Sequence, residues 1–220
     1  MFNLFKGAGR FISSFDQRGL ATIPVKTREL VWFSKSAYDR SPPEEHNGFT
    51  LDVNSPTIKV WCSKPRKEVI FAVRGTQNYE DVKTDIKVAL SREHFTPRFK
   101  IARSLLMRVL RNYPGYKIIL TGHSLGGGVV YRLADEFKGL TGEVFNPAVN
   151  LQTIQNMGDT SARIKTHIID GEPVAGVLGR PLPNTQVYTP AYGDEMKRIR
   201  KMPFQQRMLY LHALKRFPMI

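Results

Sequence analysis

A run of β-branched and aliphatic residues that ends in a glycine-rich turn constrains the fold of this chain most. The stretch KIILTGHSLGGGVVYRLADEF covers residues 117–137. Its first part has the composition of a buried strand, whereas the part after Gly128 has the pattern of a helix, although glycine is a poor helix former. We therefore expect a sharp strand-to-helix turn at Ser124, and we expect the glycines to be required by its geometry.

The spacing of two glycines around the serine explains that requirement. The segment Gly122-His123-Ser124-Leu125-Gly126 fits the pattern G-x-S-x-G between a strand and a helix. In so tight a turn, side chains two residues before and two residues after the serine would collide, so both positions need glycine. The turn raises the serine hydroxyl above the sheet, and the helix directs free backbone N–H groups towards it. Ser124 is therefore a candidate nucleophile.

A serine nucleophile needs a base, which is usually a histidine that a carboxylate orients. On this type of sheet the chain order is serine, acid, histidine. Only His167 and His212 follow Ser124 in the sequence. His167 lies inside an expected strand and before Asp170, which reverses the order, so we expect it to be a sheet histidine. His212 is the candidate base, and His123 is expected to pack beneath the turn.

The candidate acid is Asp170, which ends an expected strand just before the residues GEPV. Active-site residues of open α/β sheets gather at the carboxyl ends of the strands. Glu172 is close enough in the chain to substitute for it. Asp135 lies in the helix after the turn, Asp159 in a loop and Asp194 at the start of the last segment, so these three are weaker candidates.

The rest of the chain alternates strands and helices. With 220 residues, of which 41% are hydrophobic, it suits a single α/β domain covering 1–220, with 1–25 as a peripheral N-terminal segment. The alternation predicts a mostly parallel sheet flanked by helices. Strands are expected at 49–53, 57–62, 68–75, 117–122, 143–146 and 165–170, helices at 27–39, 79–90 and 98–113, a loop at 41–48, and a basic, helical segment at 194–215 that is interrupted near Pro203.

The charge balance is strongly basic. There are 33 Lys and Arg against 19 Asp and Glu, so the formal net charge is +14. Such a charge favours anionic partners: a phospholipid surface, nucleic acid or an acidic protein. The excess is densest at KPRK (64–67) and KRIRK (197–201), which could also be ordinary solvated surface. Composition alone does not choose among these anions.

Other features of the sequence bear on the cellular location of the protein. It has no apolar run of about 18 residues, which a membrane-spanning helix needs, and its first residues lack the apolar core of a secretory signal. The single cysteine, Cys62, excludes an internal disulfide and gives no metal-binding pattern, so we expect it to be buried as a small apolar residue. These features favour an intracellular protein or one packaged in a particle such as a virion.

Five stretches together resemble the conserved blocks of a known family. They are VIFAVRGTQNYEDVKTDI, YKIILTGHSLGGGVVYRLA, FNPAV, IIDGEPVAGV and LHAL, in that order, over about residues 30–215. This order resembles the class 3 (fungal-type) lipase family. The resemblance implies an α/β-hydrolase fold and hydrolysis of carboxylic esters of glycerolipids, with no metal and no cofactor.

The resemblance also assigns roles. It implies a catalytic triad of Ser124, Asp170 and His212, in agreement with the order of these residues in the chain. The block RG[ST] implies that Thr76 contributes to an oxyanion hole together with the backbone N–H of Leu125.

Three departures from the family pattern matter. The acid block of the family is often D-x-V-P, whereas residues 170–174 here read DGEPV. The family's lid would fall within about 77–97, where this sequence is mostly charged, so a preference for triglyceride at oil surfaces is not expected. The secreted members also carry a signal and disulfides, and this sequence shows neither.

These observations predict a serine hydrolase of lipid esters, with a phospholipase of A-type positional choice first and a plain carboxylesterase second. Peripheral contact with an anionic membrane is a further expectation. Two alternatives stay open: a basic binding protein on a lipase scaffold, contacting nucleic acid or a virion component, and an acyltransferase or thioesterase with the same triad. The choice of acyl acceptor depends on the shape of the pocket, which is not read from the sequence. The oligomeric state is likewise not readable.

Overall fold

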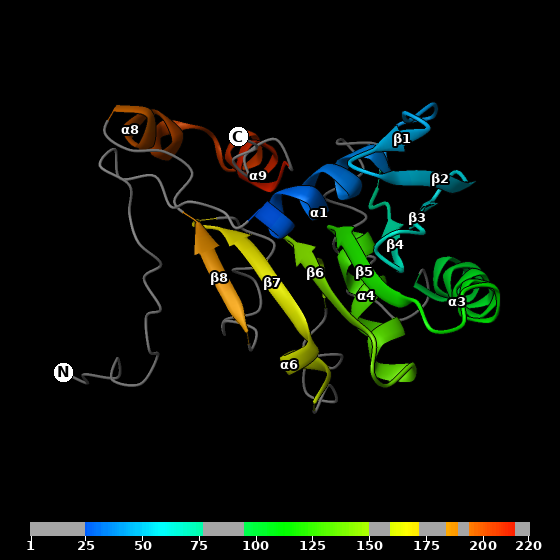
Figure 1. Cartoon of the computed structure of the whole chain (residues 1–220). Helices are drawn as coiled ribbons and strands as arrows, with labels where there is room; N and C mark the ends of the chain where they lie inside the picture. The colour runs from blue at the N-terminus through cyan, green and yellow to red at the C-terminus, as the bar shows by residue number, and fades with distance from the viewer. Residues whose placement is uncertain (1–24, 77–94, 150–158, 172–183, 189–193, 214–220) are drawn as a thin grey trace.

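The fold is seen in a computed structural model that describes residues 25–76, 95–149, 159–171, 184–188 and 194–213 (Figure 1). The expected helix at 79–90, most of the expected lid segment at 77–97, the N-terminal segment up to residue 24 and Glu172 lie outside the described residues.

The described strands form one sheet of eight strands that are ordered as they occur in the chain. The first four pair antiparallel, and every later pair, from β4–β5 to β7–β8, is parallel. The α/β class and the mostly parallel sheet are thus confirmed. The strands are β1 (Glu45–His46), β2 (Phe49–Asn54), β3 (Ile58–Ser63), β4 (Glu68–Val73), β5 (Lys117–His123), β6 (Thr141–Phe145), β7 (Ile164–Ile169) and β8 (Thr185–Tyr188).

Two short strands were not predicted. The expected loop at 41–48 contains β1, which pairs with β2 around a tight turn at Asn47 and Gly48, both with positive φ. Asn-Gly is the strongest short-range hairpin signal, so this turn was readable from the sequence. The other strand, β8, has no such signal, and its pairing with β7 forms it.

The helices cover both faces of the sheet (Figure 1). α1 contacts β4, β5 and β6, whereas α4 contacts β4, β5 and β6 from the other side and α3 contacts α4. Within the described ranges, no helix is both long and apolar enough to cross a membrane. The helices are α1 (Val25–Ser36), α3 (Phe95–Asn112), α4 (Leu125–Glu136), the unpredicted single turn α6 (Thr160–Arg163), α8 (Asp194–Lys201) and α9 (Phe204–His212).

The expected interruption near Pro203 separates the last two helices. Pro203 stands immediately before α9 with φ −50 and ψ 143. Proline has no backbone N–H and cannot continue a helix from the preceding turn, so α8 ends and α9 starts in a new direction.

The core consists of two apolar layers, one on each face of the sheet. Ile118 and Leu120 of β5 face the layer under α3 and α4, and Ile119 faces the layer under α1. Strands that are buried on both faces have continuous apolar sequences, as β4 and β5 do. Cys62 is buried in the first layer, which confirms its expected apolar role.

The parallel strands determine where a functional site can form. Because β4 to β7 run in the same direction, the residues that follow them all lie at one edge of the sheet. Figure 1 shows α9 near the arrowheads of β6 and β7 at this edge. The C-terminal part of the chain is thereby placed beside the strand-to-helix turn at Ser124.

Candidate active site

The strand-to-helix turn consists of a single residue. β5 ends at His123 and α4 begins at Leu125, so Ser124 alone reverses the chain. Its backbone has φ 55 and ψ −128, a conformation that residues other than glycine rarely adopt. Such strain costs about 1–3 kcal/mol and persists only where the surrounding structure enforces it. The serine is also buried.

Both flanking glycines are required, as predicted. A Cβ atom on Gly122 would lie 2.8 Å from the carbonyl carbon of Gly126, so the two positions do collide across the turn. A Cβ on Gly126 would lie 2.2 Å from the carbonyl oxygen of Val73 at the end of β4. The second glycine therefore also permits α4 to approach the neighbouring strand, which the sequence did not indicate.

Backbone hydrogen bonds hold the turn on both sides. The N–H of Ser124 donates to the carbonyl of Phe145 at 3.1 Å. The carbonyl of Ser124 accepts from the N–H groups of Ala148 at 2.9 Å and Gly128 at 3.3 Å. The serine is thereby fixed to β6, to the segment after β6 and to the first turn of α4.

The two expected oxyanion residues are Thr76, which comes well before Ser124 in the chain, and Leu125, which directly follows it. Leu125 is the first residue of α4, and its N–H belongs to the first turn, whose N–H groups have no partner inside the helix. Gly75 passes directly against the turn, because a Cβ on it would lie 3.0 Å from Cβ of Ser124. Thr76, the next residue, is half-buried.

His123 is a polar bridge as well as a packing residue. Its Nε2 donates to the carbonyl oxygen of His212 at 2.8 Å, because a carbonyl can only accept. Burial, followed by the nearby His212, lowers the pKa of His123 well below 6.5, so the ring is neutral and its Nδ1 accepts. The Tyr38 hydroxyl donates to that Nδ1 at 2.7 Å and accepts from the N–H of Gly75 at 3.1 Å.

The candidate base, His212, is the last residue of α9 and is buried. Its ring centroid lies 4.8 Å from that of His123, the residue directly before the serine. Its carbonyl oxygen accepts from both His123 and Asn146. The end of α9 is therefore anchored at the serine turn by its backbone.

Asn146 joins three chain segments at this point. It is fully buried and directly follows β6. Its Nδ2 donates to the carbonyls of Leu211 at 3.1 Å and His212 at 3.0 Å, and its Oδ1 accepts from the N–H of Ile169 at 3.0 Å. Its own N–H donates to the carbonyl of His167 at 2.8 Å. One side chain thus connects the ends of β6, β7 and α9.

The candidate acid, Asp170, is the first residue after β7 and is exposed. Its backbone N–H donates to the carbonyl of Tyr188 at 2.7 Å. A Cβ on Gly171 would lie 3.6 Å from Cδ1 of Leu211, the residue before His212. The turn that begins at Asp170 therefore lies against the last turn of α9.

The rejected candidates take part in other networks. His167 is fully buried in β7, more deeply than expected, and burial lowers its pKa. It donates from Nε2 to Glu143 and accepts at Nδ1 from Tyr188, each at 2.7 Å. The carboxylate of Asp135 accepts from Thr160 at 2.9 Å. No group of three metal-ligating side chains occurs within the described ranges.

Two residues of the site were not predicted. Asn146 had a signal, because it is a polar residue at the carboxyl end of an expected strand. Tyr38 had none, since it follows α1 and meets His123 only in the folded chain, 85 residues away.

Comparison with known proteins identifies the family of this chain. The family model of the Tle-like phospholipase domain matches residues 57–199, more than half of the chain. The matched range includes Ser124 and Asp170 and ends before His212. No curated protein sequence matches this chain significantly.

Solved lipases share the fold at low sequence identity. The Lip2 lipase from Yarrowia lipolytica is 14% identical with a TM-score of 0.55, over 75% of this chain and 80% of that chain. The lipase from Rhizopus microsporus var. chinensis is 17% identical with a TM-score of 0.54, over 71% and 70%. Lipase II from Rhizopus niveus is 17% identical with a TM-score of 0.54, over 72% and 77%. The α/β-hydrolase fold is thereby established, and with the family match it follows that this chain belongs to the Tle-like phospholipase family and is a lipid ester hydrolase.

Proposed function

We propose that this protein hydrolyses a carboxylic ester bond of phospholipids with Ser124 as nucleophile, His212 as general base and Asp170 as the orienting acid. The observation that carries the proposal is the backbone of Ser124, a non-glycine residue held at φ 55 directly after His123, which belongs to a buried hydrogen-bond network. A protein that only binds a ligand has no use for this strain, whereas a nucleophile does.

The proposed reaction begins when Oγ of Ser124 attacks the ester carbonyl carbon while His212 takes its proton. The oxyanion that develops is stabilised by N–H groups of Leu125 and Thr76, and removal of one such donor typically costs about 3 kcal/mol of the barrier. His212 then protonates the leaving alcohol. Water, deprotonated by His212, hydrolyses the acyl-enzyme and releases a fatty acid and the free serine.

Asp170 would stabilise the imidazolium that His212 becomes in both steps. The position of Asp170 supports this role. Asp170 follows β7, whose last N–H donates to the side chain of Asn146, and the same side chain donates to the carbonyl of His212. The two proposed partners therefore share one anchor. We infer that Asn146 sets their relative position without touching the substrate.

Phospholipid is favoured over triglyceride by charge. The net charge of +14 attracts anionic head groups, and each Lys or Arg near such a membrane contributes about 1 kcal/mol. The charged sequence at 77–97 offers few large apolar side chains for contact with an oil surface. Release of a fatty acid from the glycerol backbone would make this an A-type phospholipase.

The test combines a serine-directed probe with lipid substrates. A fluorophosphonate should label the wild-type protein and the exposed-serine control Ser41→Ala, and should not label Ser124→Ala. Fatty acid should be released from phosphatidylglycerol vesicles faster than from phosphatidylcholine vesicles or a triglyceride emulsion. Absence of labelling, together with absence of fatty acid release from any of these lipids or from a short acyl ester, would refute the proposal.

Mixed outcomes identify the alternatives. Labelling of Ser124 without ester hydrolysis, but with turnover of acyl-CoA or of an added alcohol acceptor, would indicate an acyltransferase or thioesterase. Absence of labelling with tight nucleic-acid binding would indicate a binding protein on a lipase scaffold.

A further inference from the structure

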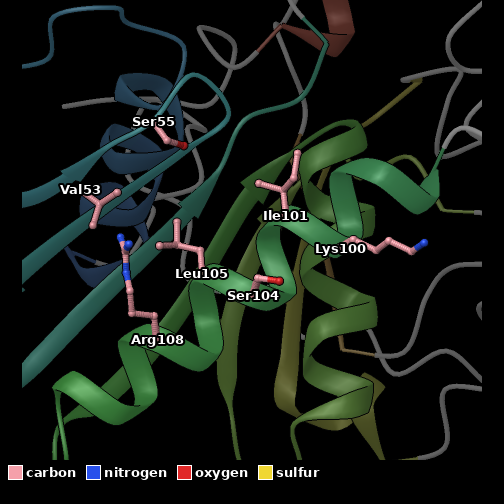
Figure 2. Close-up of a pocket in the computed structure, with 7 residues that line it drawn as sticks. All are labelled: Val53, Ser55, Lys100, Ile101, Ser104, Leu105 and Arg108. Carbon is pink, nitrogen blue, oxygen red and sulfur yellow. The ribbon is translucent and has the colours of Figure 1, made fainter.

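An open groove of about 510 Å³ lies between the end of β2 and α3. Its apolar lining comes from Val53 on the strand side and from Ile101 and Leu105 on the helix. Lys100 and Arg108 also line it, and Figure 2 shows Arg108 extending from α3 towards Val53. The groove therefore combines an aliphatic floor with cations at its rim.

The solvent face of α3 carries an unusual share of apolar surface. Ile101 is 57% exposed and Met107 37% exposed, and among the described residues the only other exposed large apolar side chain is Val187. Burying an aliphatic side chain of this size gains about 1.5–3 kcal/mol. Ile101 and Leu105 are four residues apart and so share a face of α3, and both line the groove, which indicates a surface that another apolar phase covers.

All the charged residues of α3 are basic. Five Lys and Arg and no Asp or Glu occur in Phe95–Asn112. Arg98 donates to the carbonyl of Arg74 at 3.1 Å, and Arg103 pairs with Glu136. Within the part of the chain that the structure describes, Lys100 and Arg108 form no ion pair. Figure 2 shows that Arg108 extends towards Val53, whereas the end of Lys100 extends away from Val53.

This surface begins next to the candidate active site. The carbonyl that Arg98 holds belongs to Arg74, which directly precedes Gly75 and Thr76 of the expected oxyanion segment. Ile101 is three residues further along α3, which corresponds to a rise of about 4.5 Å. A lipid surface in contact with Ile101 would therefore contact the helix that also holds that segment through Arg98.

We propose that the groove and the exposed face of α3 dock the protein on an anionic phospholipid surface. The aliphatic side chains Ile101, Leu105 and Val53 contact the acyl region, and Lys100 and Arg108 contact the phosphates above it. Nucleic acid or an acidic peptide would satisfy the cations but would leave Ile101 exposed, whereas a membrane interface supplies both layers. Docking needs no reaction at Ser124, so it extends beyond the proposed function.

The docking test uses the full chain with Ser124→Ala, so that the lipid is not consumed. Co-sedimentation is measured with vesicles of phosphatidylglycerol and of phosphatidylcholine. Ile101→Ser is compared with Val187→Ser, because Val187 on β8 is 55% exposed and serves as a matched apolar control. We expect Ile101→Ser to weaken binding to phosphatidylglycerol about tenfold, and Val187→Ser to leave it unchanged.

The charge contribution is tested in the same way. Arg108→Glu is compared with Lys64→Glu, a charge reversal of the same size at an exposed turn between β3 and β4. We expect Arg108→Glu to weaken binding roughly fivefold or more, and Lys64→Glu to have a smaller effect. Arg108→Gln provides a second variant if thermal unfolding shows that the glutamate destabilises α3.

Equal losses for Arg108→Glu and Lys64→Glu would overturn the proposal, since they would show attraction by net charge alone. Equal effects of Ile101→Ser and Val187→Ser would also overturn it, since they would show that Ile101 has no specific contact with the lipid. The proposal would also be overturned if the Arg108 variants bound duplex DNA more weakly but bound phosphatidylglycerol vesicles normally. The fluorophosphonate reaction of the protein with Ser124 intact tests the chemistry separately. If Ser124 is labelled but the α3 variants bind vesicles normally, the proposed function stands and the docking proposal is refuted.

Discussion

Asn146 shows how one side chain can position a site without taking part in its chemistry. Its φ is 40, a left-handed conformation that asparagine tolerates better than most residues. This conformation directs its amide to two carbonyls of α9 while its oxygen accepts from the N–H at the end of β7. The amide fits because it has two donors and one acceptor. Neither aspartate nor alanine can reproduce that set.

Asn146→Ala tests this role. The change leaves the buried N–H of Ile169 and the carbonyl of Leu211 without this partner, at about 1–3 kcal/mol for each group. We expect kcat on a soluble ester and the fluorophosphonate labelling rate to fall about a hundredfold, since small displacements of reacting groups cost that much. KM should change little. Asn146→Asp should be no better, because its carboxylate faces two carbonyls. A folded Asn146→Ala protein that is labelled at the wild-type rate would contradict the prediction.

Gly126 tests the steric basis of the turn. Gly126→Ala places a methyl group 2.2 Å from the carbonyl oxygen of Val73, so α4 must move away from β4. We expect a loss of several kcal/mol in the free energy of unfolding and loss of labelling at Ser124. Gly115→Ala is the control: φ is 76 but no atom lies within 4 Å, so only about 1–2 kcal/mol of backbone strain results. Urea unfolding measures both, and equal effects would disprove the steric account.

At the scale of secondary-structure elements, a chain of hydrogen bonds links the segment after β4 to α9. The N–H of Gly75 donates to the Tyr38 hydroxyl, that hydroxyl donates to His123, and His123 donates to the carbonyl of His212. Tyr38 lies just after α1, so α1 positions the hydroxyl that connects the proposed oxyanion segment to the proposed base. The elements around the serine are thereby held as one unit.

Tyr38→Phe breaks this link with little change in shape. Gly75 N–H and Nδ1 of His123 both lose the hydroxyl, and we expect kcat to fall about tenfold to a hundredfold because the oxyanion segment is less well placed. Tyr116→Phe is the control, a half-buried tyrosine before the opposite end of β5. Steady-state kinetics on a soluble ester provide the measurement. Equal kcat values for the two variants would show that the link does not position the site.

For the whole molecule, two buried neutral imidazoles make stability depend on pH. Burial lowers the pKa of His123 and of His167 below 6.5, so the unfolded chain binds protons at these residues that the folded chain does not. Their contribution is fully present above about pH 6.5 and is lost as the pH falls below that value. We expect the free energy of unfolding, measured by urea titration, to decrease from pH 7 to pH 5.

His167→Gln supplies the comparison. The variant has one fewer site for proton uptake on unfolding, so the slope of unfolding free energy against pH should be shallower, whatever its stability at pH 7. Burial also lowers the pKa of His46, which is half-buried at the edge of the sheet, so His46→Gln should make the slope shallower as well, but by less because its ring is less buried than that of His167. An unchanged slope in His167→Gln would contradict the assignment of a neutral buried ring.

The sequence by itself determined the local features. The apolar run of β5, the glycines two residues either side of Ser124 and the alternation of strands with helices predicted the turn and the mostly parallel sheet. These follow from sterics and burial within short segments, which composition records directly. Chain order and strand ends selected Ser124, Asp170 and His212 as candidates. Ser124 and Asp170 directly follow β5 and β7, and the backbone carbonyl of His212 accepts from Asn146, which directly follows β6.

Only the tertiary structure decided what holds those candidates. Asn146 meets Leu211 across 65 residues, and Tyr38 meets His123 across 85, so no local pattern marks either contact. Strand β8 contains the strand formers Thr185, Val187 and Tyr188, but it is only four residues long and its partner β7 is supplied by the fold. A hydrogen bond between distant segments requires that both have already been placed by the core. Its partners are therefore decided by the packed chain and not by the residues beside them.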